Sequence, residues 1–354
     1  MPSELRRPTL RWGIIGTGLI SSWFVGDMVV PRADVTATHV IQAIGSSSSE
    51  KGRAFVEKYG GDISPSIYGS YDAVYADPDV DIVYIGIPHA FHKDACLKAI
   101  SHGKHVLCEK PFTLNAQEGQ EVFNAAKKMG VYIMEAMWTR FMPLTAQLLR
   151  MIHREKVIGD VHRVFCDFGL VIDLDSLPAT SRLKDPALGA GALLDIGVYS
   201  LTWGLLGLDE GIAGTALKPQ VFSAQSISQG IDVATSIVLY YPQNGRQGIL
   251  TSTMKTKSDP VFARIEGSHG TILIEGIATS VPHRFTVIPS DATAERQVYD
   301  APPKVGKGFF YEADAVARDI AAGRVENATM PWGETLRVLA LMDGIRAAGV
   351  SQED

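Results

Sequence analysis

The chain has 354 residues, of which 46% are hydrophobic and 20% charged, and its formal net charge is −6. This composition is typical of a folded globular protein and excludes a disordered or fibrous chain. The negative balance and the scattered Lys and Arg argue against nucleic acid as a partner. No run of 18 apolar residues stands out and residues 1–12 lack the apolar core of a secretion signal, so we expect no membrane partner.

The cysteines indicate the compartment. Cys96, Cys108 and Cys166 have no metal-ligand spacing, and this pattern predicts buried thiols in a reducing, cytoplasmic environment.

The first third of the chain alternates apolar runs with helical patterns. Strands are predicted at 10–15, 39–45, 80–88, 105–110 and 131–137, and helices at 19–30, 49–60, 92–103 and 113–130. Alternation of this kind, with continuously apolar strands, predicts a parallel sheet that is covered on both faces.

The pattern changes near residue 140. Longer alternating strands follow, at 160–172, 220–228, 234–242, 247–256, 262–276 and 284–289, with helices at 143–156, 189–205, 309–322 and 331–348. We therefore predict an α/β protein of two domains. Residues 1–137 form a Rossmann dinucleotide-binding domain, and 138–354 form an α+β domain with an open, mostly antiparallel sheet for substrate binding.

A glycine motif, "GTGLIS", lies between the first strand and the first helix. Gly16 permits a tight turn, and Gly18 lets the backbone approach a pyrophosphate that binds at the helix N-terminus. We expect Thr17, Leu19 and Ile20 to join this site. A plain tight turn is the alternative interpretation.

The end of the second strand bears on the choice between NAD and NADP. A carboxylate there favours NAD, but this chain has Ser46, Ser47 and Ser48 after Gly45, with Lys51 and Arg53 nearby. The small serine hydroxyls leave room for the 2′-phosphate of NADP, and the nearby cations would attract it, so we predict NADP. The alternative interpretation of the serines is an ordinary helix N-cap.

"CEKP" ends a later strand of the same sheet, where the nicotinamide should bind. Pro111 restricts Lys110 to extended geometry and permits a cis bond, which would direct the lysine into the cleft. Pro88, His89 and His92 follow another strand. Two histidines three apart could bind a metal, but no further ligands accompany them, so we predict cofactor or substrate contacts and no metal site.

The second domain offers Asp195 and Tyr199, four apart and therefore on one face of a predicted helix. Trp138 and Arg140 lie where the two domains join, and Phe168 follows in "CDFG". Each of these residues could also be purely structural.

Together, "GTGLIS", "CEKPF", "MEAMWTRF" and "GALLDIGVY" resemble the glucose–fructose oxidoreductase (Gfo/Idh/MocA) family over essentially the whole chain. Within it, the combination is most similar to the dimeric dihydrodiol dehydrogenases and the fungal NADP-dependent D-xylose 1-dehydrogenases. Ala190, where relatives carry glycine, and a short segment 278–308 without aromatic pocket residues depart from the family pattern.

The resemblance implies an NADP-dependent dehydrogenase of a small sugar, such as D-xylose oxidised at C1 to the lactone. It also implies a homodimer or larger homo-oligomer, with a face of the sheet in the 138–354 domain as the dimerisation surface. A dihydrodiol dehydrogenase, a carbonyl or sugar reductase, and a non-catalytic dinucleotide-binding regulator remain alternatives. The implied catalytic residues are Lys110, Tyr199 and Asp195. The implied cofactor-binding residues are Gly16, Thr17, Gly18, Leu19, Ile20, Ser46, Ser47, Ser48, Pro88, His89, Glu109, Lys110 and Arg140, and the implied substrate-binding residues are His92, Trp138, Phe168, Asp195 and Tyr199.

Overall fold

The computed structural model describes residues 7–303 and 305–349. The first half of the stretch 1–12, in which no secretion signal is expected, therefore lies outside the described residues. The chain forms two compact units. The first contains the residues up to 113, 117–141 and 303–332, and the second contains 114–116, 142–302 and the residues from 333 onward.

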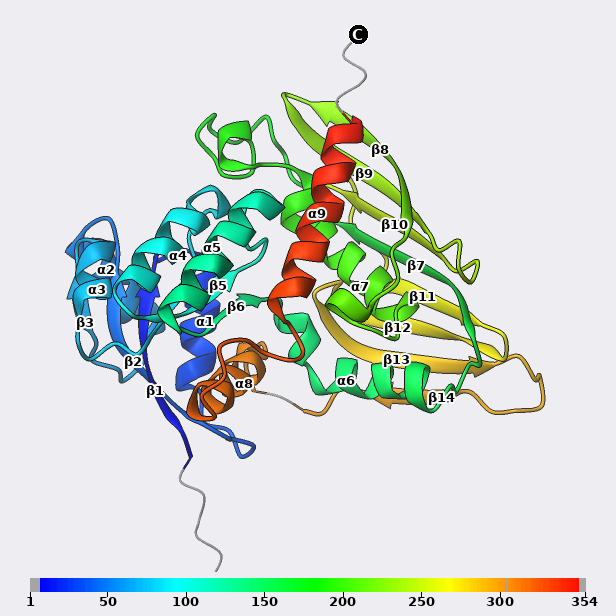
Figure 1. Cartoon of the computed structure of the whole chain (residues 1–354), viewed down its shortest axis with the longest axis horizontal. Helices are drawn as coiled ribbons and strands as arrows, with labels where there is room; N and C mark the ends of the chain where they lie inside the picture. The colour runs from blue at the N-terminus through cyan, green and yellow to red at the C-terminus, as the bar shows by residue number, and fades with distance from the viewer. Residues whose placement is uncertain (1–6, 304, 350–354) are drawn as a thin grey trace, which may run out of the picture. The chain divides into compact units, whose positions relative to one another are not determined.

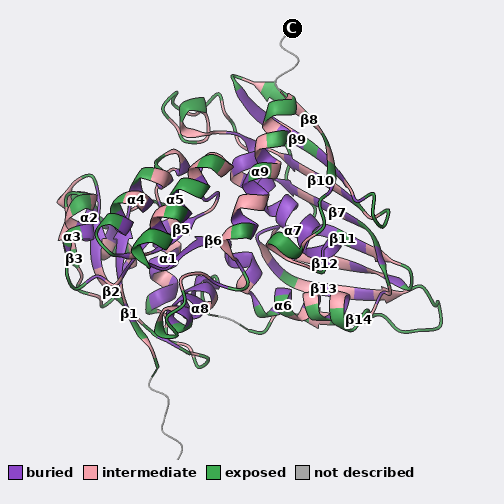
Figure 2. Cartoon of the chain, in the orientation of Figure 1, coloured by how far each residue is buried: buried purple, intermediate pink, exposed green. Residues whose placement is uncertain are grey.

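The first unit is built on a six-stranded sheet in which every neighbouring pair is parallel. In spatial order its strands are β3 (Ser66–Tyr68), β2 (Thr38–Gly45), β1 (Thr9–Ile15), β4 (Ile82–Ile85), β5 (His105–Glu109) and β6 (Ile133–Ala136). The central strands are almost wholly buried, as Figure 2 shows, because helices cover both faces. The predicted Rossmann architecture is confirmed.

The helices of this unit are α1 (Leu19–Val29), α2 (Ser49–Tyr59), α3 (Tyr71–Ala76), α4 (His92–Ser101), α5 (Ala116–Met129) and α8 (Phe309–Ala321), with 3₁₀ turns η1 (His89–Phe91) and η2 (Trp138–Phe141). Four helices of this unit were predicted, and α3 and the return of α8 were not (Figure 1).

Helix α8 returns to the first unit from far along the chain. The buried carboxylate of Asp27, on α1, accepts the backbone N–H groups of Lys307, Gly308 and Phe309 at 2.8, 2.6 and 2.8 Å. These are donors at the start of α8 that would otherwise lack partners. The Phe309 ring also stacks on Trp138, with centroids 4.3 Å apart. The division predicted at residue 137 therefore differs from the structure, because these contacts place 303–332 in the first unit and extend its middle segment to 141.

A second buried carboxylate, Asp314, ties α8 to the start of the sheet. It accepts hydrogen bonds from Arg32 at 2.7 Å and from the Thr36 hydroxyl at 2.9 Å, and it lies 2.9 Å from Nε2 of His39. Burial opposes ionisation, but the bonds from His39, Arg32 and Thr36 outweigh it and lower the pKa of Asp314 to about 2.

The second unit contains an eight-stranded sheet whose neighbouring pairs are all antiparallel except β7 and β10. In spatial order the strands are β14 (Gln297–Asp300), β13 (Val281–Pro289), β12 (Gly270–Ala278), β11 (Val261–Gly267), β7 (Val161–Gly169), β10 (Gln247–Thr253), β9 (Ile231–Tyr240) and β8 (Gln220–Ser228). The predicted open, mostly antiparallel sheet is confirmed.

Helices pack against one side of this sheet (Figure 1). They are α7 (Val198–Leu208), η5 (Leu193–Gly197) and α6 (Pro143–Leu149). The other helical segments of this unit are η3 (Arg150–Arg154), η4 (Pro186–Leu188), η6 (Ala213–Thr215) and α9 (Trp332–Gly349). Helix α7 packs so closely on β10 and β7 that two of its positions have no room for a side chain. A Cβ at Gly204 would lie 2.6 Å from Leu250, and one at Gly207 would lie 2.8 Å from Val164. The stretch 186–208 is long and apolar enough to cross a bilayer, which the sequence analysis did not anticipate, but 94% of its most apolar window is buried, as in a core helix.

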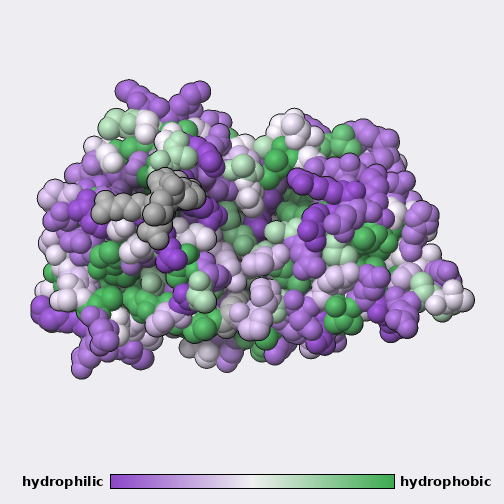
Figure 3. Space-filling model, turned by 90° about the horizontal axis from the view of Figure 1, so that it is seen from below, coloured by the Kyte–Doolittle hydropathy of each residue, from purple (hydrophilic) through white to green (hydrophobic). Residues whose placement is uncertain are grey.

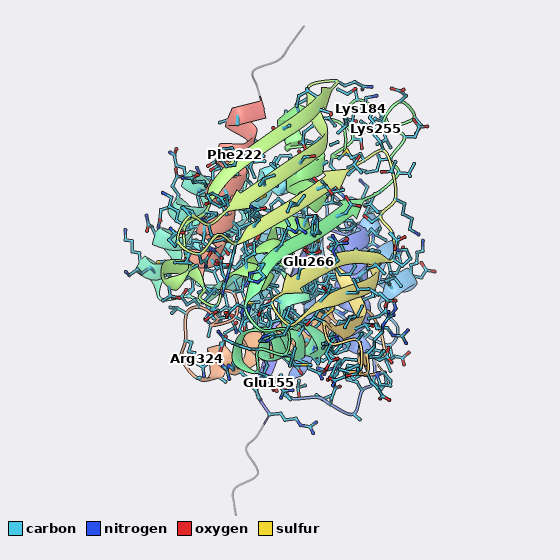
Figure 4. The ribbon with its side chains drawn as sticks, turned by 90° about the vertical axis from the view of Figure 1, so that its right-hand side faces the viewer. Glu155, Lys184, Phe222, Lys255, Glu266 and Arg324 are labelled. Carbon is cyan, nitrogen blue, oxygen red and sulfur yellow. The ribbon has the colours of Figure 1, made fainter. Side chains whose placement is uncertain are left out.

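The other side of the sheet is exposed in this chain. Figure 4 views it face on, with Phe222 on β8 and Glu266 on β11 labelled. Phe222 is 58% exposed and lies beside the exposed Val238 on β9. Val238 in turn lies beside Ile249 on β10, which lies beside Phe165 on β7, so these four apolar residues form a row across the sheet. Elsewhere, hydrophobic and hydrophilic residues are interspersed over the face seen in Figure 3, as is usual for folded proteins. Use of the exposed sheet for dimerisation stays a prediction.

Asp314 gives a pH-dependent test of the α8 attachment. Its carboxyl has a pKa of about 2 in the folded chain and about 3.9 when unfolded, so its stabilisation is present above about pH 4 and is lost as the pH falls through about 2. We expect Asp314→Asn to lower the free energy of unfolding by about 2 kcal/mol at pH 7, by about half as much at pH 3 and by little at pH 2, measured by urea denaturation.

The control is Asp34→Asn, which removes an exposed carboxylate paired with the same Arg32 at 3.2 Å. Exposed pairs contribute about 0–1 kcal/mol, so this variant should be close to the parent. Equal losses in both variants would show that Asp314 does not anchor α8.

Candidate active site

The glycine turn after β1 has the geometry that a bound pyrophosphate requires. Gly16 has φ +94°, and a Cβ there would lie 2.7 Å from Ile87 and 3.1 Å from the carbonyl oxygen of Gly86. Gly18 is exposed and is the N-cap of α1, whose first turn carries no acidic residue. Leu19 is 64% exposed and Ile20 is half-buried, so the positive end of the helix dipole faces outward.

The serine run continues this surface at the end of β2. The hydroxyls of Thr17 and Ser46 lie 3.2 Å apart, which joins the two loops. Ser47 is exposed, and its hydroxyl accepts a hydrogen bond from Nζ of Lys51 at 3.0 Å. A hydroxyl beside a lysine, with no carboxylate at the strand end, suits a phosphate group.

Two residues near this loop are used differently from the prediction. The hydroxyl of Ser48 accepts the backbone N–H of Lys51 at 3.3 Å and so caps α2. Arg53 pairs with Glu50 at 2.9 Å. Ser47 and Lys51 are therefore the stronger candidates for contact with a 2′-phosphate. The turn and these side chains together fit a dinucleotide.

Lys110 follows β5 at the same edge of the sheet. The register pairs Ile15 with Ile85 and Ile85 with Cys108, so the ends of β1, β4 and β5 are aligned. Lys110 is half-buried and its bond to Pro111 is cis, as expected. Glu109, the residue before it, is buried and accepts the Tyr84 hydroxyl at 2.7 Å and the Lys110 backbone N–H at 3.2 Å.

His92 supports this turn and does not present a free ring nitrogen to substrate. Its ring is 1% exposed; Nε2 lies 2.8 Å from the carbonyl oxygen of Ile87, and Nδ1 lies 3.0 and 3.2 Å from those of Pro111 and Phe112. Burial, and then the neighbouring His89, lower its pKa to about 4. The predicted substrate contact through His92 is corrected to a positioning role that joins the ends of β4 and β5.

The remaining predicted residues of the first unit are largely internal. Pro88 is half-buried at the N-cap of η1, and His89 is buried beside His92. Trp138 and Arg140 are buried in η2, where Trp138 stacks on Phe309. This packing is the structural role that the sequence left open for Trp138, and substrate contact by Trp138 and cofactor contact by Arg140 stay predictions.

In the second unit, Asp195 and Tyr199 belong to consecutive helical segments. Asp195 lies in the π turn η5 and accepts Nη1 of Arg182 at 3.1 Å, whereas Tyr199 lies in α7 with its ring against Phe168, at a centroid distance of 5.6 Å. The predicted single α-helical face is therefore interrupted, and π turns of this kind are frequent at functional sites.

The start of η5 is fixed by Asp232 on β9. Its carboxylate accepts the backbone N–H of Leu193 at 2.7 Å and the hydroxyl of Thr235 at 2.8 Å. Gly191 has φ +143°, and a Cβ there would collide with the Asp232 carboxylate. Gly191 is thus required next to Ala190, the position at which the chain departs from the family pattern.

Sequence reasoning did not identify Glu312. This residue of α8 is fully buried, and neither of its carboxyl oxygens has a hydrogen-bond partner among the described residues. Burial first, and then the charges of Glu109 and Asp27, raise its pKa well above the ordinary value. The available signal was a glutamate within the apolar run "FFYEADAVA", at a position that faces the core.

Glu312 predicts a specific dependence of stability on pH. The pKa of Glu312 is higher in the folded chain than in the unfolded chain, so the protonated carboxyl stabilises the fold fully below about pH 4.3. As the pH rises from there toward the pKa of the folded chain, the free energy of unfolding falls by about 1.4 kcal/mol per pH unit. Glu312→Gln cannot ionise. Measured by urea unfolding, the variant should therefore gain about 1–3 kcal/mol relative to the parent between pH 5 and pH 7.

Glu334→Gln is the matched control, because Glu334 is equally buried but its two oxygens lie 2.9 Å from Arg337. It should be destabilised at both pH values. An unfolding difference for Glu312→Gln that does not change with pH would contradict a neutral carboxyl.

Two family models match most of the chain. "Oxidoreductase family, NAD-binding Rossmann fold" matches residues 10–137, and "GFO/IDH/MocA C-terminal domain" matches residues 146–273.

Relatives and a solved structure agree with these matches. D-xylose 1-dehydrogenase (NADP(+)) of Hypocrea jecorina is 33% identical over 97% of this chain and 93% of its own. Trans-1,2-dihydrobenzene-1,2-diol dehydrogenase of Xenopus tropicalis is 32% identical over 94% and 96%. A 3-ketoreductase from Actinomadura kijaniata, solved with NADP, has the same fold with a TM-score of 0.79, 23% identity and coverage of 96% and 98%.

The predicted family, fold and enzyme class are therefore confirmed. The chain is an oxidoreductase of the Gfo/Idh/MocA family.

Proposed function

We propose that the chain is an NADP-dependent dehydrogenase that oxidises an aldopyranose such as D-xylose at C1 to the lactone. The observation that carries the proposal is the position of Lys110. It follows β5 at the sheet edge that also bears the glycine turn and the Ser47–Lys51 pair, so a lysine cation lies at the cofactor edge. The named activity of the Hypocrea jecorina relative supports the choice of sugar and of NADP.

Bound NADP supplies a hydride acceptor at C4 of its nicotinamide. The chain's own residues handle the proton. Tyr199 accepts the proton of the substrate hydroxyl, and because a tyrosine ordinarily has a pKa of about 10, it needs a nearby cation to stabilise the phenolate. Lys110 provides that cation, and Asp195, held by Arg182, orients the sugar or the lysine.

A cyclic diol is the second candidate substrate, since the Xenopus tropicalis relative is named for one. A carbonyl or sugar reductase would use the same residues in the reverse direction. A non-catalytic regulator has no need of Lys110 and Tyr199. Turnover on a panel of aldoses and diols, with NADP and NAD in parallel, separates these alternatives. We also propose that the enzyme is cytoplasmic, because its three thiols are buried and unpaired.

The proton relay predicts the kinetics of Lys110→Met and Tyr199→Phe. Each should lower turnover by about 10²–10⁴-fold, the usual contribution of proton transfer, while NADPH still binds. The double variant should be little worse than either single one, because the two residues act as a unit. Steady-state kinetics measures turnover, and NADPH fluorescence titration measures cofactor binding. Near-parental turnover in Lys110→Met would contradict this mechanism.

The serine loop predicts the cofactor preference. Ser47→Asp places a carboxylate beside the 2′-phosphate, and we expect it to weaken NADP binding by about 1–3 kcal/mol with little change for NAD. Gln120→Glu adds the same charge on the exposed face of α5 and should leave both affinities unchanged. Equal turnover of the parent with NAD and NADP would show that this loop does not select the phosphate.

A further inference from the structure

The second unit contains a cavity of ≈ 790 Å³ that begins one aromatic ring from Tyr199. Phe168, at the end of β7, lines the cavity and also contacts the Tyr199 ring, edge to face at 5.6 Å. The volume lies in the upper part of the range of about 300–1,000 Å³ that holds drug-sized ligands. A single pentose ring is much smaller, so the cavity offers room beyond the sugar.

One wall is a loop that is fixed to the end of β7. Ser258 bonds to Gly169 through both its backbone N–H and its hydroxyl oxygen, and a Cβ at Gly169 would collide with the carbonyl oxygen of Thr256. The hydroxyls of Ser258 and Thr279 donate to Asp167, at 2.6 and 2.8 Å. Both hydroxyls are therefore directed into the protein and not into the cavity.

The opposite wall is an irregular end of β12. Its pairing shifts between Glu275 and Gly276 and again between Gly276 and Ala278, and a Cβ at Gly276 would lie 2.8 Å from the ring of Phe262. This bulge leaves Ile277 77% exposed at the cavity. Bulges next to active sites commonly redirect a side chain in this way.

The lining is thus apolar, with charge at the rim. The apolar lining side chains are those of Phe168, Leu170, Pro260, Phe262, Ile277 and Ala278. At the rim, the side chains of the exposed Lys257 and His283 make no hydrogen bond to other described residues, whereas Oδ1 of Asp259 accepts the Val261 N–H at 2.8 Å. An apolar floor beside an uncommitted ammonium suits an apolar ring that bears a carboxylate.

We propose that this cavity is a second subsite, which binds an aromatic or cycloaliphatic carboxylate attached to, or bound beside, the group that Tyr199 acts on. Its effect on turnover rests on the proposed function, but binding does not. The proposal adds Lys257 and Ile277 as specificity-determining residues. It also gives a role to the segment near residue 278 that lacks the aromatic residues of the family.

The test is calorimetric binding of 2-naphthoate to the NADP-loaded enzyme, with 2-naphthamide as the neutral isostere and acetate as the anion without a ring. We expect naphthoate to bind more tightly than naphthamide, acetate not to bind, and naphthoate to inhibit sugar turnover competitively. Lys257→Gln should weaken naphthoate several-fold and leave naphthamide unchanged. Lys255→Gln, a neighbouring lysine outside the cavity lining that is labelled in Figure 4, is the matched control and should change neither.

Ile277→Glu should weaken naphthoate at least tenfold, because it places a like charge at the cavity, and Ala278→Trp should abolish both aromatic ligands by filling the space. Ile277 is exposed, so its variant tests the site even if Ala278→Trp does not fold. Absence of naphthoate binding, or binding unchanged in Ile277→Glu, overturns the subsite. If naphthoate and the variants behave as expected but the enzyme turns over none of the aldoses and diols, the subsite is supported and the proposed function is rejected.

Discussion

The parallel register of β1, β4 and β5 is the constraint on which the rest of the site depends. Because Ile15, Ile85 and Cys108 are aligned across three strands, the glycine turn, the Pro88–His92 segment and Lys110 all emerge at one edge of the sheet. The buried ring of His92 lies between two of those strand ends, with the carbonyl oxygens of residues 87, 111 and 112 within 3.2 Å of its nitrogens. A shift of one strand would separate the lysine from the glycine turn, so the buried, continuously apolar strands hold the proposed site together as well as stabilise the fold.

Local signals predicted much of this arrangement. Gly16 was expected in a tight turn and has φ +94°, and the serine run does follow β2 without a carboxylate at the strand end. Such features depend on neighbouring residues alone. The role of His92 could not be predicted, because its partners come from residues 87, 111 and 112 and only the folded sheet brings them to one ring. The sequence around a histidine at a strand end does not distinguish ring nitrogens that contact substrate from ring nitrogens that contact the backbone.

Buried carboxylates show the same limit more clearly. The sequence around each of three carboxylates, Asp27, Asp232 and Glu312, indicates only a helix or a strand. In the fold, Asp27 caps a distant helix and Asp232 fixes a π turn. Glu312 has no hydrogen-bond partner among the described residues. Their environments are set by chain segments far away in sequence. The same reason explains the domain boundary. Periodicity identified α8 as a helix, but its assignment to the first unit follows from contacts of Asp27, Phe309 and Asp314 with residues far away in sequence.

That return of α8 has a consequence for biosynthesis. Asp27 and its partners at the start of α8 are separated by about 280 residues, so the ribosome completes almost the whole chain before the first unit can close. Until residues 303–332 emerge, the apolar faces of Phe24 and Trp138 that Phe309 covers stay open to water. The nascent Rossmann sheet is thus an incomplete body that must be protected from aggregation while the entire eight-stranded sheet is translated. A fragment ending at residue 141 would have the same exposed surface permanently.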